Sequence, residues 1–530
     1  MDKTGLYAVS ARNTHMQHWQ EPRQVDLCQS ARHLRRIRLV WSMWSVQVAD
    51  ASNCRSLYMQ ISNESTPAVA AVAFDAALLR KLNQLGPRYT SYPTADRFSE
   101  AFTADDYQHA VARRRDMGAR HALSLYLHIP FCNTICYYCA CNKVVSKNTA
   151  KAALYLTYLQ REISMQAALF EGMNQVEQLH FGGGTPTFLS DDQMDGLMAH
   201  LHRNFEFAAD EQGEYSIEID PRTVTPARIV TLRRQGFNRI SLGVQDFDPA
   251  VQQAVNRIQP EEDTLKIIDA ARYAGFRSVS IDLIYGLPRQ NVISMSQTLN
   301  KVIAASPDRI AIYNYAHMPH IFKPQRRIAE SELPTPDAKI DMLFLCIKRL
   351  TDAGYVYIGM DHFAKPDDDL AIAQRQGRLH RNFQGYSTHA EADLVACGVS
   401  AISAVGASYS QNEKTLEAYY QRLDRHELPI ARGIKLSMDD LLRRLIIQHL
   451  MCHFELSLAS IEIAHPIKFS EYFASELAQL ELLAADGLLN LDDEWITVTM
   501  KGRLLIRNIC MVFDRYLDPE KSPLRYSKTI

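Results

Sequence analysis

The sequence lacks long hydrophobic runs and an excess of charge of either sign. No stretch approaches the roughly 20 apolar residues that a transmembrane helix requires, so we expect no membrane span. Lysine and arginine number 58 against 60 aspartate and glutamate residues, which gives a formal net charge of −2. This balance argues against nucleic acid and anionic membrane surfaces as partners. The 530 residues suffice for several domains, or for one large barrel with additions.

Cysteine is scarce outside one short stretch. The chain has ten cysteines, and the six that stand alone are Cys28, Cys54, Cys346, Cys397, Cys452 and Cys510. Isolated cysteines in so long a chain do not form the dense disulfide framework of a small secreted domain. A structural zinc site usually takes its ligands from two separated pairs, and no second C-x2-C pair exists here. Disulfides and structural zinc are therefore both disfavoured.

The other four cysteines lie within ten residues, Cys132-Asn-Thr-Ile-Cys136-Tyr-Tyr-Cys139-Ala-Cys141, directly after an apolar run. Three thiolates on a [4Fe–4S] cube leave one iron without a protein ligand, where a reactant can bind. We therefore predict that Cys132, Cys136 and Cys139 are the metal ligands. A fourth thiolate would block the open iron. Cys141 is thus either a packed free cysteine or a residue with a catalytic or cluster-environment role.

The C-x3-C-x2-C spacing, with Tyr138 before the third cysteine, resembles the signature of the radical S-adenosylmethionine (SAM) enzymes. In that family the amino and carboxylate groups of the methionine moiety chelate the open iron. An electron from the cluster then breaks the sulfonium and releases a 5′-deoxyadenosyl radical. The resemblance implies one [4Fe–4S] cluster and S-adenosylmethionine as cofactors. Because such an exposed cluster needs a reducing compartment, we expect a cytoplasmic protein.

Strand-like runs alternate with helical stretches through the middle of the chain. The six runs are 123–131, 176–181, 215–220, 239–244, 279–285 and 309–315. Helix starts are marked by Ser190 with Gln193 and by Thr-Pro pairs at 225–226 and 335–336. Six β/α units in sequence require parallel strands with right-handed crossovers. The predicted fold is α/β: a partial (β/α)6 barrel of the triosephosphate-isomerase type, with an N-terminal arm and a C-terminal, mostly helical, winged-helix-like domain.

Composition and periodicity divide the chain into five predicted segments. They are an unstructured or mis-assigned extension (1–58), an N-terminal arm and helix (59–115), the radical SAM partial barrel (116–330), a barrel-closing and pocket-lining segment (331–432) and the C-terminal helical domain (433–530). In the last segment, Ser437 begins a helix, 488–499 forms a hairpin and 501–516 forms another helix. Winged helices often bind DNA, but no concentrated basic face is present for phosphates. A structural or substrate-covering lid is the better interpretation.

The extension at 1–58 shows no persistent helical or alternating period. We interpret it as lying outside the working enzyme and Met59 as a plausible translation start, because 73–82 is the first convincing helix. A chain that begins at Met59 is expected to keep the activity and thermal stability of the full chain. Loss of either property, measured side by side with the full chain, would contradict this interpretation.

Further candidate residues follow the strands, where reactive groups of such barrels lie. Gly182-Gly-Gly-Thr-Pro-Thr187 follows the second strand, and its bare backbone could meet the amino or carboxylate group of a methionine moiety. Glu218, Gln245 and Asp282 lie at or near strand ends, where acceptors could hold ribose hydroxyls or an ammonium group. Arg257 could pair with a carboxylate. Taken singly, each residue could equally belong to a polar network at the barrel rim.

The match extends to one family among these radical enzymes. Residues 74–516 resemble the oxygen-independent coproporphyrinogen III oxidase (coproporphyrinogen dehydrogenase) family through motifs at 86–95, 128–142, 182–187, 243–246, 360–364, 381–386 and 501–510. Ala140 departs from the glycine that the family commonly has, which adds only one methyl group. The resemblance implies oxidative decarboxylation of two propionates of coproporphyrinogen III to vinyl groups. The products would be protoporphyrinogen IX, for haem biosynthesis, with carbon dioxide, methionine and 5′-deoxyadenosine.

The resemblance also implies two adenosylmethionine molecules in one pocket. The cluster-bound molecule would contact Tyr126, Gly183, Glu218 and Ile402. The second would contact Tyr138, Gly184, Thr185, Gln245, Arg257, Asp282 and Ala316. Tyr126 and Cys141 are the candidate catalytic residues. Arg88 and Arg381 are our own candidates for binding substrate carboxylates, because guanidinium groups bind carboxylates in bidentate fashion.

The expected partners are the porphyrinogen and a one-electron reductant such as a flavodoxin or ferredoxin, and the expected state is a monomer. Two alternatives stay open. A haem-binding chaperone of the same superfamily would share the barrel and the first three cysteines. It is not expected to carry the Cys-Asn pair at 141–142 or the arm at 86–94. A zinc-stabilised regulator would instead use the winged-helix-like end.

Overall fold

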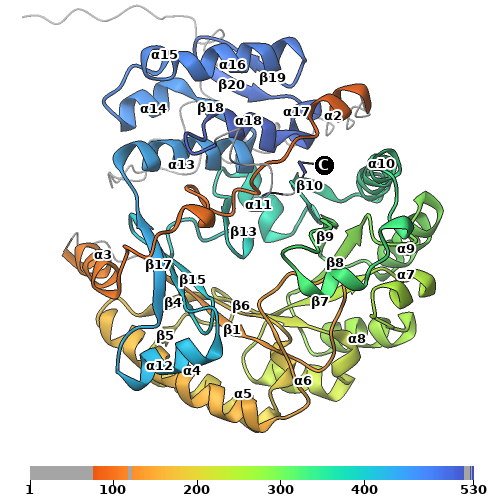
Figure 1. Cartoon of the computed structure of the whole chain (residues 1–530), viewed down its shortest axis with the longest axis vertical. Coiled ribbons are helices and arrows are strands. Elements are labelled where there is room, and N and C mark those ends of the chain that lie inside the picture. Colours follow the sequence, from red (N-terminus) through yellow and green to blue (C-terminus); the bar gives the residue numbers. More distant parts are fainter. Residues whose placement is uncertain (1–75, 117–121, 518–525, 527, 530) are drawn as a thin grey trace, which may run out of the picture. The chain divides into compact units, whose positions relative to one another are not determined.

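A row of parallel strands forms the centre of the structure and carries most of the candidate residues (Figure 1). The six predicted strands all form, as β1 (Leu123–Ile129), β4 (Gln175–Gly183), β6 (Glu214–Ile219), β7 (Arg239–Gln245), β8 (Ser278–Tyr285) and β9 (Arg309–Asn314). They pair in parallel in the order β9-β8-β7-β6-β4-β1. The parallel row continues beyond β1 with β14 (Asp393–Cys397), a strand that we do not predict from the sequence.

This computed structural model describes residues 76–116, 122–517, 526 and 528–529. All of them belong to Val69–Ile530, the second of two units into which the chain divides. The predicted extension at 1–58 and the start at Met59 lie outside the described residues. So does the beginning of the helix predicted at 73–82, whose described part is α2 (Ala76–Leu82). Within the described ranges, no helix combines the length and apolar character needed to cross a membrane.

Strand alternation turns one face of the row towards a common interior, because successive side chains of a strand point to opposite faces. In β6, Ile217 and Ile219 pack in the hydrophobic core, while Glu218 between them is only half-buried. β7 and β8 repeat this alternation, and β8 pairs with β7 at Gly243 and Asp282. Glu218, Gln245 and Asp282 therefore share the inner face. The periodicity that forms the strands also gathers the polar candidates.

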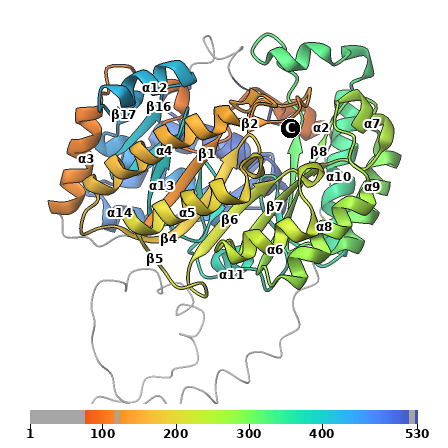
Figure 2. The same cartoon turned by 90° about the horizontal axis from the view of Figure 1, so that it is seen from below.

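Helices cover the outer face of the row, as Figures 1 and 2 show from two sides. They are α4 (Ala150–Leu169), α5 (Asp191–Asn204), α6 (Pro226–Arg234), α8 (Glu261–Tyr273), α9 (Val292–Ala305) and α10 (Pro336–Asp352). The predicted starts are confirmed: Ser190 forms a capping box with Gln193, and Thr225 and Thr335 each cap a helix that has proline in its first turn. These caps satisfy backbone N–H groups that a helix cannot pair internally.

The strand row is open at both edges, so the barrel is partial, as predicted. Residues 331–432 do not close it into a ring. They add β10 (Val356–Gly359) and β11 (His362–Ala364) beyond β9, and β15 (Ile402–Val405), β16 (Ser408–Asn412) and β17 (Ile430–Lys435) beyond β14. The added strands pair antiparallel with their neighbours. Antiparallel strands need only short connections, which explains why the β/α rhythm fades in this segment.

The C-terminal part is mostly helical, with one small sheet. Its elements are α13 (Met438–His453), β18 (Glu455–Ser457), α14 (Leu458–Ala464), α15 (Phe469–Tyr472), α16 (Ala474–Ala485), β19 (Leu489–Leu491), β20 (Trp495–Val498), α17 (Met500–Leu504) and α18 (Ile506–Val512). The helix start at Ser437 and the hairpin are confirmed. The single helix predicted at 501–516 is instead two short helices that meet at Leu505, and the second ends at Val512.

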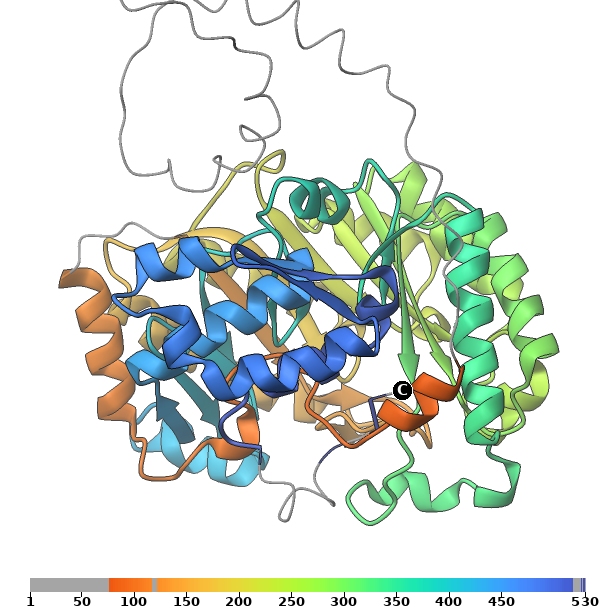
Figure 3. The same ribbon diagram turned by 90° about the horizontal axis from the view of Figure 1, so that it is seen from above.

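The N-terminal arm at 86–94 lies against these C-terminal helices. Tyr89 donates its hydroxyl to Asp514 at 3.0 Å, and the Arg507 guanidinium donates to the Pro87 carbonyl at 2.8 Å. Tyr89 and Tyr92 are buried in the same hydrophobic cluster as residues of α13 and α18. Figure 3 shows α2 (orange) beside the C-terminal elements (blue). The two ends of the described chain therefore fold together.

Candidate functional site

A cavity of about 300 Å³ lies where the carboxyl ends of β4, β6 and β7 meet the cysteine loop (residues 132–141). Its walls combine thiols, carboxylates, arginines and bare glycine backbone. The predicted site residues that line it are Cys132, Cys136, Tyr138, Cys139, Cys141, Gly183, Gly184, Thr185, Glu218, Gln245, Arg257 and Asp282. The structure thus brings together all three predicted metal ligands and most of the predicted cofactor contacts.

The cysteine loop is anchored by hydrogen bonds to the segment that follows α7 (Pro249–Ala254). The Tyr137 amide donates to the Val255 carbonyl at 2.9 Å. The Asn256 side chain donates to the Ile135 carbonyl at 2.7 Å. A loop with little regular structure of its own therefore takes its position from the chain beyond β7, which the sequence pattern does not reveal.

Hydrogen-bond donors surround the thiols. Arg222 Nη2 and Arg257 Nη1 each lie 3.5 Å from Cys136 Sγ, and the Thr185 hydroxyl lies 3.6 Å from Cys132 Sγ. Cations and donors near sulfur favour thiolate over thiol, and outer hydrogen bonds orient thiolate ligands. This donor set fits an iron–sulfur cluster held by thiolates. In the part of the chain that the structure describes, no three cysteine, histidine or carboxylate side chains converge closely enough for a single metal ion.

Cys139 and Cys141 form an unequal pair. The pKa of Cys139 is lowered, chiefly because the Cys141 thiol hydrogen-bonds to its sulfur; burial opposes this shift and the nearby Lys143 adds to it. The same hydrogen bond raises the pKa of Cys141 well above its ordinary value. Cys141 is therefore held in its thiol form beside a predicted ligand. Its predicted catalytic role stays a prediction.

The glycine run after β4 is required by close packing. Gly183 has a φ of +112°, and a Cβ there would lie 2.5 Å from the His128 ring. A Cβ on Gly184 would lie 2.7 Å from backbone atoms of Pro130 and Phe131. Only glycine fits both positions, because a side chain would meet the backbone or the histidine. The Gly184 amide meanwhile donates to the Ile129 carbonyl at 2.8 Å, which joins this loop to the end of β1.

Two histidines and a tyrosine connect β1, β4 and β6 on the inner face. The rings of Tyr126 and His180 stack with centroids 5.8 Å apart, and the Tyr126 hydroxyl lies 3.1 Å from His128 Nδ1. His180 Nε2 lies 3.3 Å from a Glu218 oxygen, and the Gly183 amide donates to the other oxygen at 3.1 Å. Burial alone would raise the pKa of Glu218, but these hydrogen bonds lower it. Glu218 is thus an ionised acceptor at neutral pH.

The carboxyl of Asp282 behaves differently from that of Glu218. Burial and the nearby charge of Glu218 raise the pKa of Asp282 to about 7. The Ser241 hydroxyl donates to it at 3.2 Å. An ionised Glu218 can hold an ammonium group. A carboxyl near its midpoint can accept from, or donate to, a ribose hydroxyl.

Arg257 is a buried cation with unused hydrogen-bonding capacity. Its guanidinium donates to both oxygens of Asp220 at 3.3 Å and to the Gly243 carbonyl at 2.5 Å. Its Nε is buried without a partner in the described chain. Asp220 is itself shared with Arg222, at 2.6 Å. Two arginines therefore face one carboxylate, which leaves positive charge for a ligand carboxylate.

Three of the predicted cofactor contacts do not line this cavity. Tyr126 lies on the inner face of β1, next to His180. The carbonyls of Ala316 and Tyr138 both accept from the Gln325 side chain, at 3.2 and 3.0 Å. Gln325 therefore links Ala316 to Tyr138 in the cavity wall. Ile402 on β15 packs in a small apolar cluster around Phe98 and Tyr409. Cofactor contacts of these three residues stay predictions.

The two predicted substrate arginines lie near Tyr313, a residue of the cavity wall. Burial raises the pKa of Tyr313, and the guanidinium groups of Arg381 and Arg88 offset part of that rise. Arg88 is ion-paired with Asp361 at 3.1 Å. Arg381 is buried on β12 (His380–Asn382) over the Tyr386 ring, at 4.8 Å from its centroid. Its Nε and Nη1 lack partners among the described residues.

Several polar residues of the site are missed by the sequence analysis. Among them are His180, Asp220, Arg222 and Lys143, of which the last three line the cavity. The available signal was position: Asp220 and Arg222 directly follow β6, where a barrel places functional groups. Glu218 on β6 is a predicted site residue, but the residues that directly follow this strand are not. His180 lies inside a strand, where only the alternation shows which face it takes.

Comparisons with known proteins agree with this arrangement. The sequence profile of the Radical SAM superfamily matches residues 126–302, and that of the HemN C-terminal domain matches residues 436–505. The oxygen-independent coproporphyrinogen III oxidase of Pseudomonas aeruginosa is 51% identical over 459 residues, which cover 87% of this chain and 99% of the relative. The Escherichia coli protein of the same name is 50% identical over 462 residues, which cover 87% of this chain and 100% of that relative.

A solved structure extends the likeness to the fold. The structure of coproporphyrinogen III oxidase (HemN) from Escherichia coli, described as a radical SAM enzyme, superposes with a TM-score of 0.80 at 49% sequence identity. The match covers 84% of this chain and 100% of that one. The open parallel sheet and the helical C-terminal part are therefore shared with that protein.

Proposed function

Because the chain belongs to the oxygen-independent coproporphyrinogen III oxidase family of radical SAM enzymes, we propose that it oxidatively decarboxylates two propionates of coproporphyrinogen III to vinyl groups. The product is protoporphyrinogen IX, an intermediate of haem biosynthesis. The observation that carries this proposal is one cavity with three cysteine thiols on one wall and Glu218, Arg257 and Asp282 on the others. Acid–base groups alone could not activate the C–H bond β to a propionate carboxylate.

The thiol wall fits one [4Fe–4S] cluster, with Cys132, Cys136 and Cys139 as ligands. Arg222 and Arg257 hydrogen-bond to Cys136 and so stabilise its thiolate form. When bound, the cluster supplies one electron, and adenosylmethionine supplies the 5′-deoxyadenosyl group that takes up a substrate hydrogen atom. The protein orients these reactants and keeps water and other C–H bonds away.

Two molecules of adenosylmethionine are proposed to share the cavity. Tyr126, Gly183, Glu218 and Ile402 would contact the cluster-bound molecule, where the ionised Glu218 can accept from its ammonium group. The residues for the second are Tyr138, Gly184, Thr185, Gln245, Arg257, Asp282 and Ala316. The unpaired Nε of Arg257 supports a carboxylate beside it, and Gln325 joins the carbonyls of Tyr138 and Ala316.

Arg381 is proposed to bind a propionate carboxylate of the substrate. A guanidinium that is 4% exposed and has two unpartnered nitrogens in the described chain lacks the anion that such burial usually requires. Arg88 already has Asp361 as its partner, so Arg381 is the stronger candidate of the two. The four propionates of the substrate supply the missing charge.

Replacing Arg381 with alanine should weaken binding of coproporphyrin III, the fluorescent oxidised form of the substrate, by about tenfold or more, because a charge-assisted hydrogen bond is lost. Cleavage of adenosylmethionine without substrate should continue at its normal rate. Fluorescence titration measures the affinity. The matched control is Arg378→Ala, an exposed arginine three residues away whose side chain, among the described residues, hydrogen-bonds to Gln376 alone. Equal affinity of Arg381→Ala and the unaltered protein would refute the assignment.

The test of the whole proposal is an anaerobic assay of the reconstituted protein with coproporphyrinogen III, adenosylmethionine and a chemical reductant. Vinyl products and 5′-deoxyadenosine should form together. Stable stoichiometric haem binding without decarboxylation would favour the chaperone alternative instead. A preparation that is not brown without oxygen, and does not bleach in air, would count against any cluster.

We also propose a one-electron reductant, such as a flavodoxin or ferredoxin, as a partner. The proposed state of the protein is a monomer in the cytoplasm. The cluster chemistry supports the location, because an exposed iron–sulfur cluster needs reducing surroundings. Size-exclusion chromatography with light scattering tests the monomer directly.

A further inference from the structure

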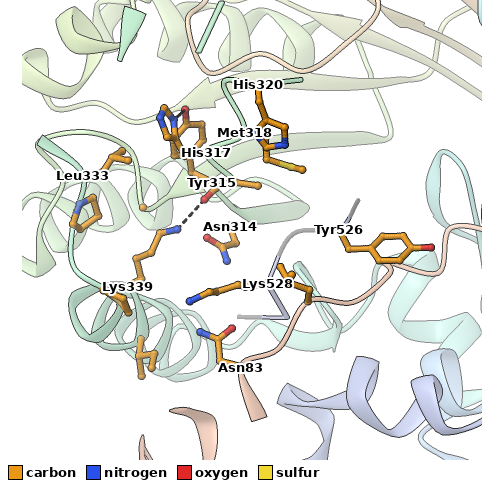
Figure 4. Close-up of a pocket in the computed structure, with 16 residues that line it drawn as sticks. Asn83, Asn314, Tyr315, His317, Met318, His320, Leu333, Lys339, Tyr526 and Lys528 are labelled. Carbon is orange, nitrogen blue, oxygen red and sulfur yellow. Dashed lines mark hydrogen bonds between the residues drawn. The ribbon is translucent and has the colours of Figure 1, made fainter. Parts of the chain in front are cut away.

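A second cavity, of about 380 Å³, lies beyond the carboxyl end of β9. It is enclosed by the loop after β9, the start of α10, the residues that follow α2 and the C-terminal tail (Figure 4). Ala316 belongs to its wall, and Gln325 joins Ala316 to Tyr138 in the wall of the cluster cavity. The two cavities are therefore near neighbours. None of the lysines and histidines of this second cavity has a part in the function proposed above.

The second cavity is positively charged. Figure 4 shows the ammonium groups of Lys339 and Lys528 turned towards the same space, on either side of Asn314. Among the described residues, the Lys339 ammonium group donates one hydrogen bond, to the Tyr315 carbonyl at 2.8 Å. No carboxylate in the described chain pairs with either ammonium group. Burial and the neighbouring Lys528 lower the pKa of Lys339 to about 8, so it is still mostly charged at neutral pH.

Further groups around the cavity add to this imbalance. Burial and the charge of Arg88 lower the pKa of Arg507 to about 10. The Arg507 guanidinium donates hydrogen bonds to backbone carbonyls, including that of Lys528 at 3.0 Å. The charge of Asp361 raises the pKa of Arg507, but Asp361 is already ion-paired with Arg88.

The lysines are held in place, which distinguishes them from surface lysines. Gly286 leaves room for the Lys339 stem, because a Cβ there would overlap Lys339 Cε. Lys528 is fixed through its backbone, which bridges to Leu85 and accepts from Arg507. Since the charge of Lys528 lowers the pKa of Lys339, an anion bound between the two ammonium groups would offset their repulsion.

We propose that this cavity is a carboxylate subsite, in which Lys339 and Lys528 hold a substrate propionate that is not decarboxylated. The inference rests on the proposed function and names a further contact for the same substrate. Two of the four propionates remain in the product, so the enzyme must hold carboxylates away from the reacting carbon. A fixed anchor for one of them determines which propionates face the cluster cavity. Positioning by remote binding of this kind is a common source of catalytic selectivity.

The test compares two fluorescent porphyrins in binding to the anaerobically reconstituted full chain, with adenosylmethionine present and no reductant. Coproporphyrin III has four propionates. In mesoporphyrin IX, ethyl groups replace the two propionates that would react. The Lys339→Gln variant should bind both ligands at least about tenfold more weakly, by a similar factor, because the lost contact serves a propionate that both retain. Lys339→Arg, which keeps the charge, should recover much of the affinity.

Lys348→Gln is the matched control, since Lys348 lies on α10 as well but is exposed and paired with Asp352. It should bind both ligands normally. Thermal unfolding midpoints identify any variant that fails to fold. Unchanged affinity of Lys339→Gln for both porphyrins, or weaker binding of coproporphyrin III alone, would overturn the subsite. Failure of the unaltered protein to bind coproporphyrin III would overturn the proposed function together with it.

Discussion

Replacing Cys136 with serine is expected to abolish porphyrinogen conversion and 5′-deoxyadenosine formation. Cys136 is the most buried of the three predicted ligands, and two arginines donate to its sulfur. A serine hydroxyl is a poor iron ligand, and the remaining arginines would face no thiolate. We expect turnover to fall by more than about three orders of magnitude, because no acid–base route replaces radical chemistry. Turnover is measured after anaerobic reconstitution.

The matched control for this prediction is Cys346→Ser. Cys346 is also fully buried, but it lies on α10 within the hydrophobic core and outside the cavity. It should lose some stability while keeping the iron and sulfide content per folded chain. Cys136→Ser should lose both iron and the brown absorbance. Normal conversion by Cys136→Ser would refute the cluster assignment on which the proposed function depends.

Replacing Arg257 with methionine is expected to have the second-largest effect. The change removes a buried cation that contacts Asp220, Gly243 and Cys136 together. If Arg257 holds the carboxylate of the second adenosylmethionine, porphyrinogen conversion should fall by about 100-fold, because a buried bidentate charge pair is lost. Equilibrium dialysis should find two bound molecules per chain for the unaltered protein and one for the variant. Two molecules bound by Arg257→Met would contradict the assignment.

Arg309→Met separates this effect from a general loss of stability. Arg309, on β9, is likewise an arginine in an ion pair, with both Asp368 oxygens at 2.9 Å, but it is not part of the cavity wall. Breaking a buried pair costs about 3 kcal/mol or more, so this control should unfold at lower temperature. It should still bind two molecules of adenosylmethionine. Iron analysis of Arg257→Met shows whether the loss of its contact to Cys136 also affects the cluster.

Some residues of the candidate site can be predicted from local sequence patterns, and others can be recognised only from their tertiary contacts. Cysteine spacing, the glycine run and the polar residues near strand ends are local patterns, and the cavity contains nearly all of them. Asp220 and Arg222 are missed because their importance comes from contacts with residues that are distant in sequence. Arg222 contacts Cys136, 86 residues away, and Asp220 contacts Arg257, 37 residues away. No local pattern encodes such contacts. The second cavity could not be predicted from the sequence, because residues from both ends of the described chain contribute to its wall.

The edges of the sheet show the same division. Each central strand is a run of apolar residues between turn signals, so its position follows from the sequence. The short strands β10, β11 and β15–β17 carry weaker patterns and form because a neighbouring strand offers unpaired backbone groups. That neighbour exists only in the folded protein. The partial barrel was predicted, but the way in which 331–432 extends both edges of the sheet instead of closing it could therefore not be predicted.

By itself, the sequence determined the order of β/α units, the identity of the cluster-binding loop and the family, because strand periodicity and ligand spacing are local properties of the chain. Only the tertiary structure decided which charges are left without partners. Arg381 and Lys339 look like any other basic residue in the sequence. Each becomes a candidate for binding an anion once folding has removed much of it from water and has left it without a carboxylate partner among the described residues.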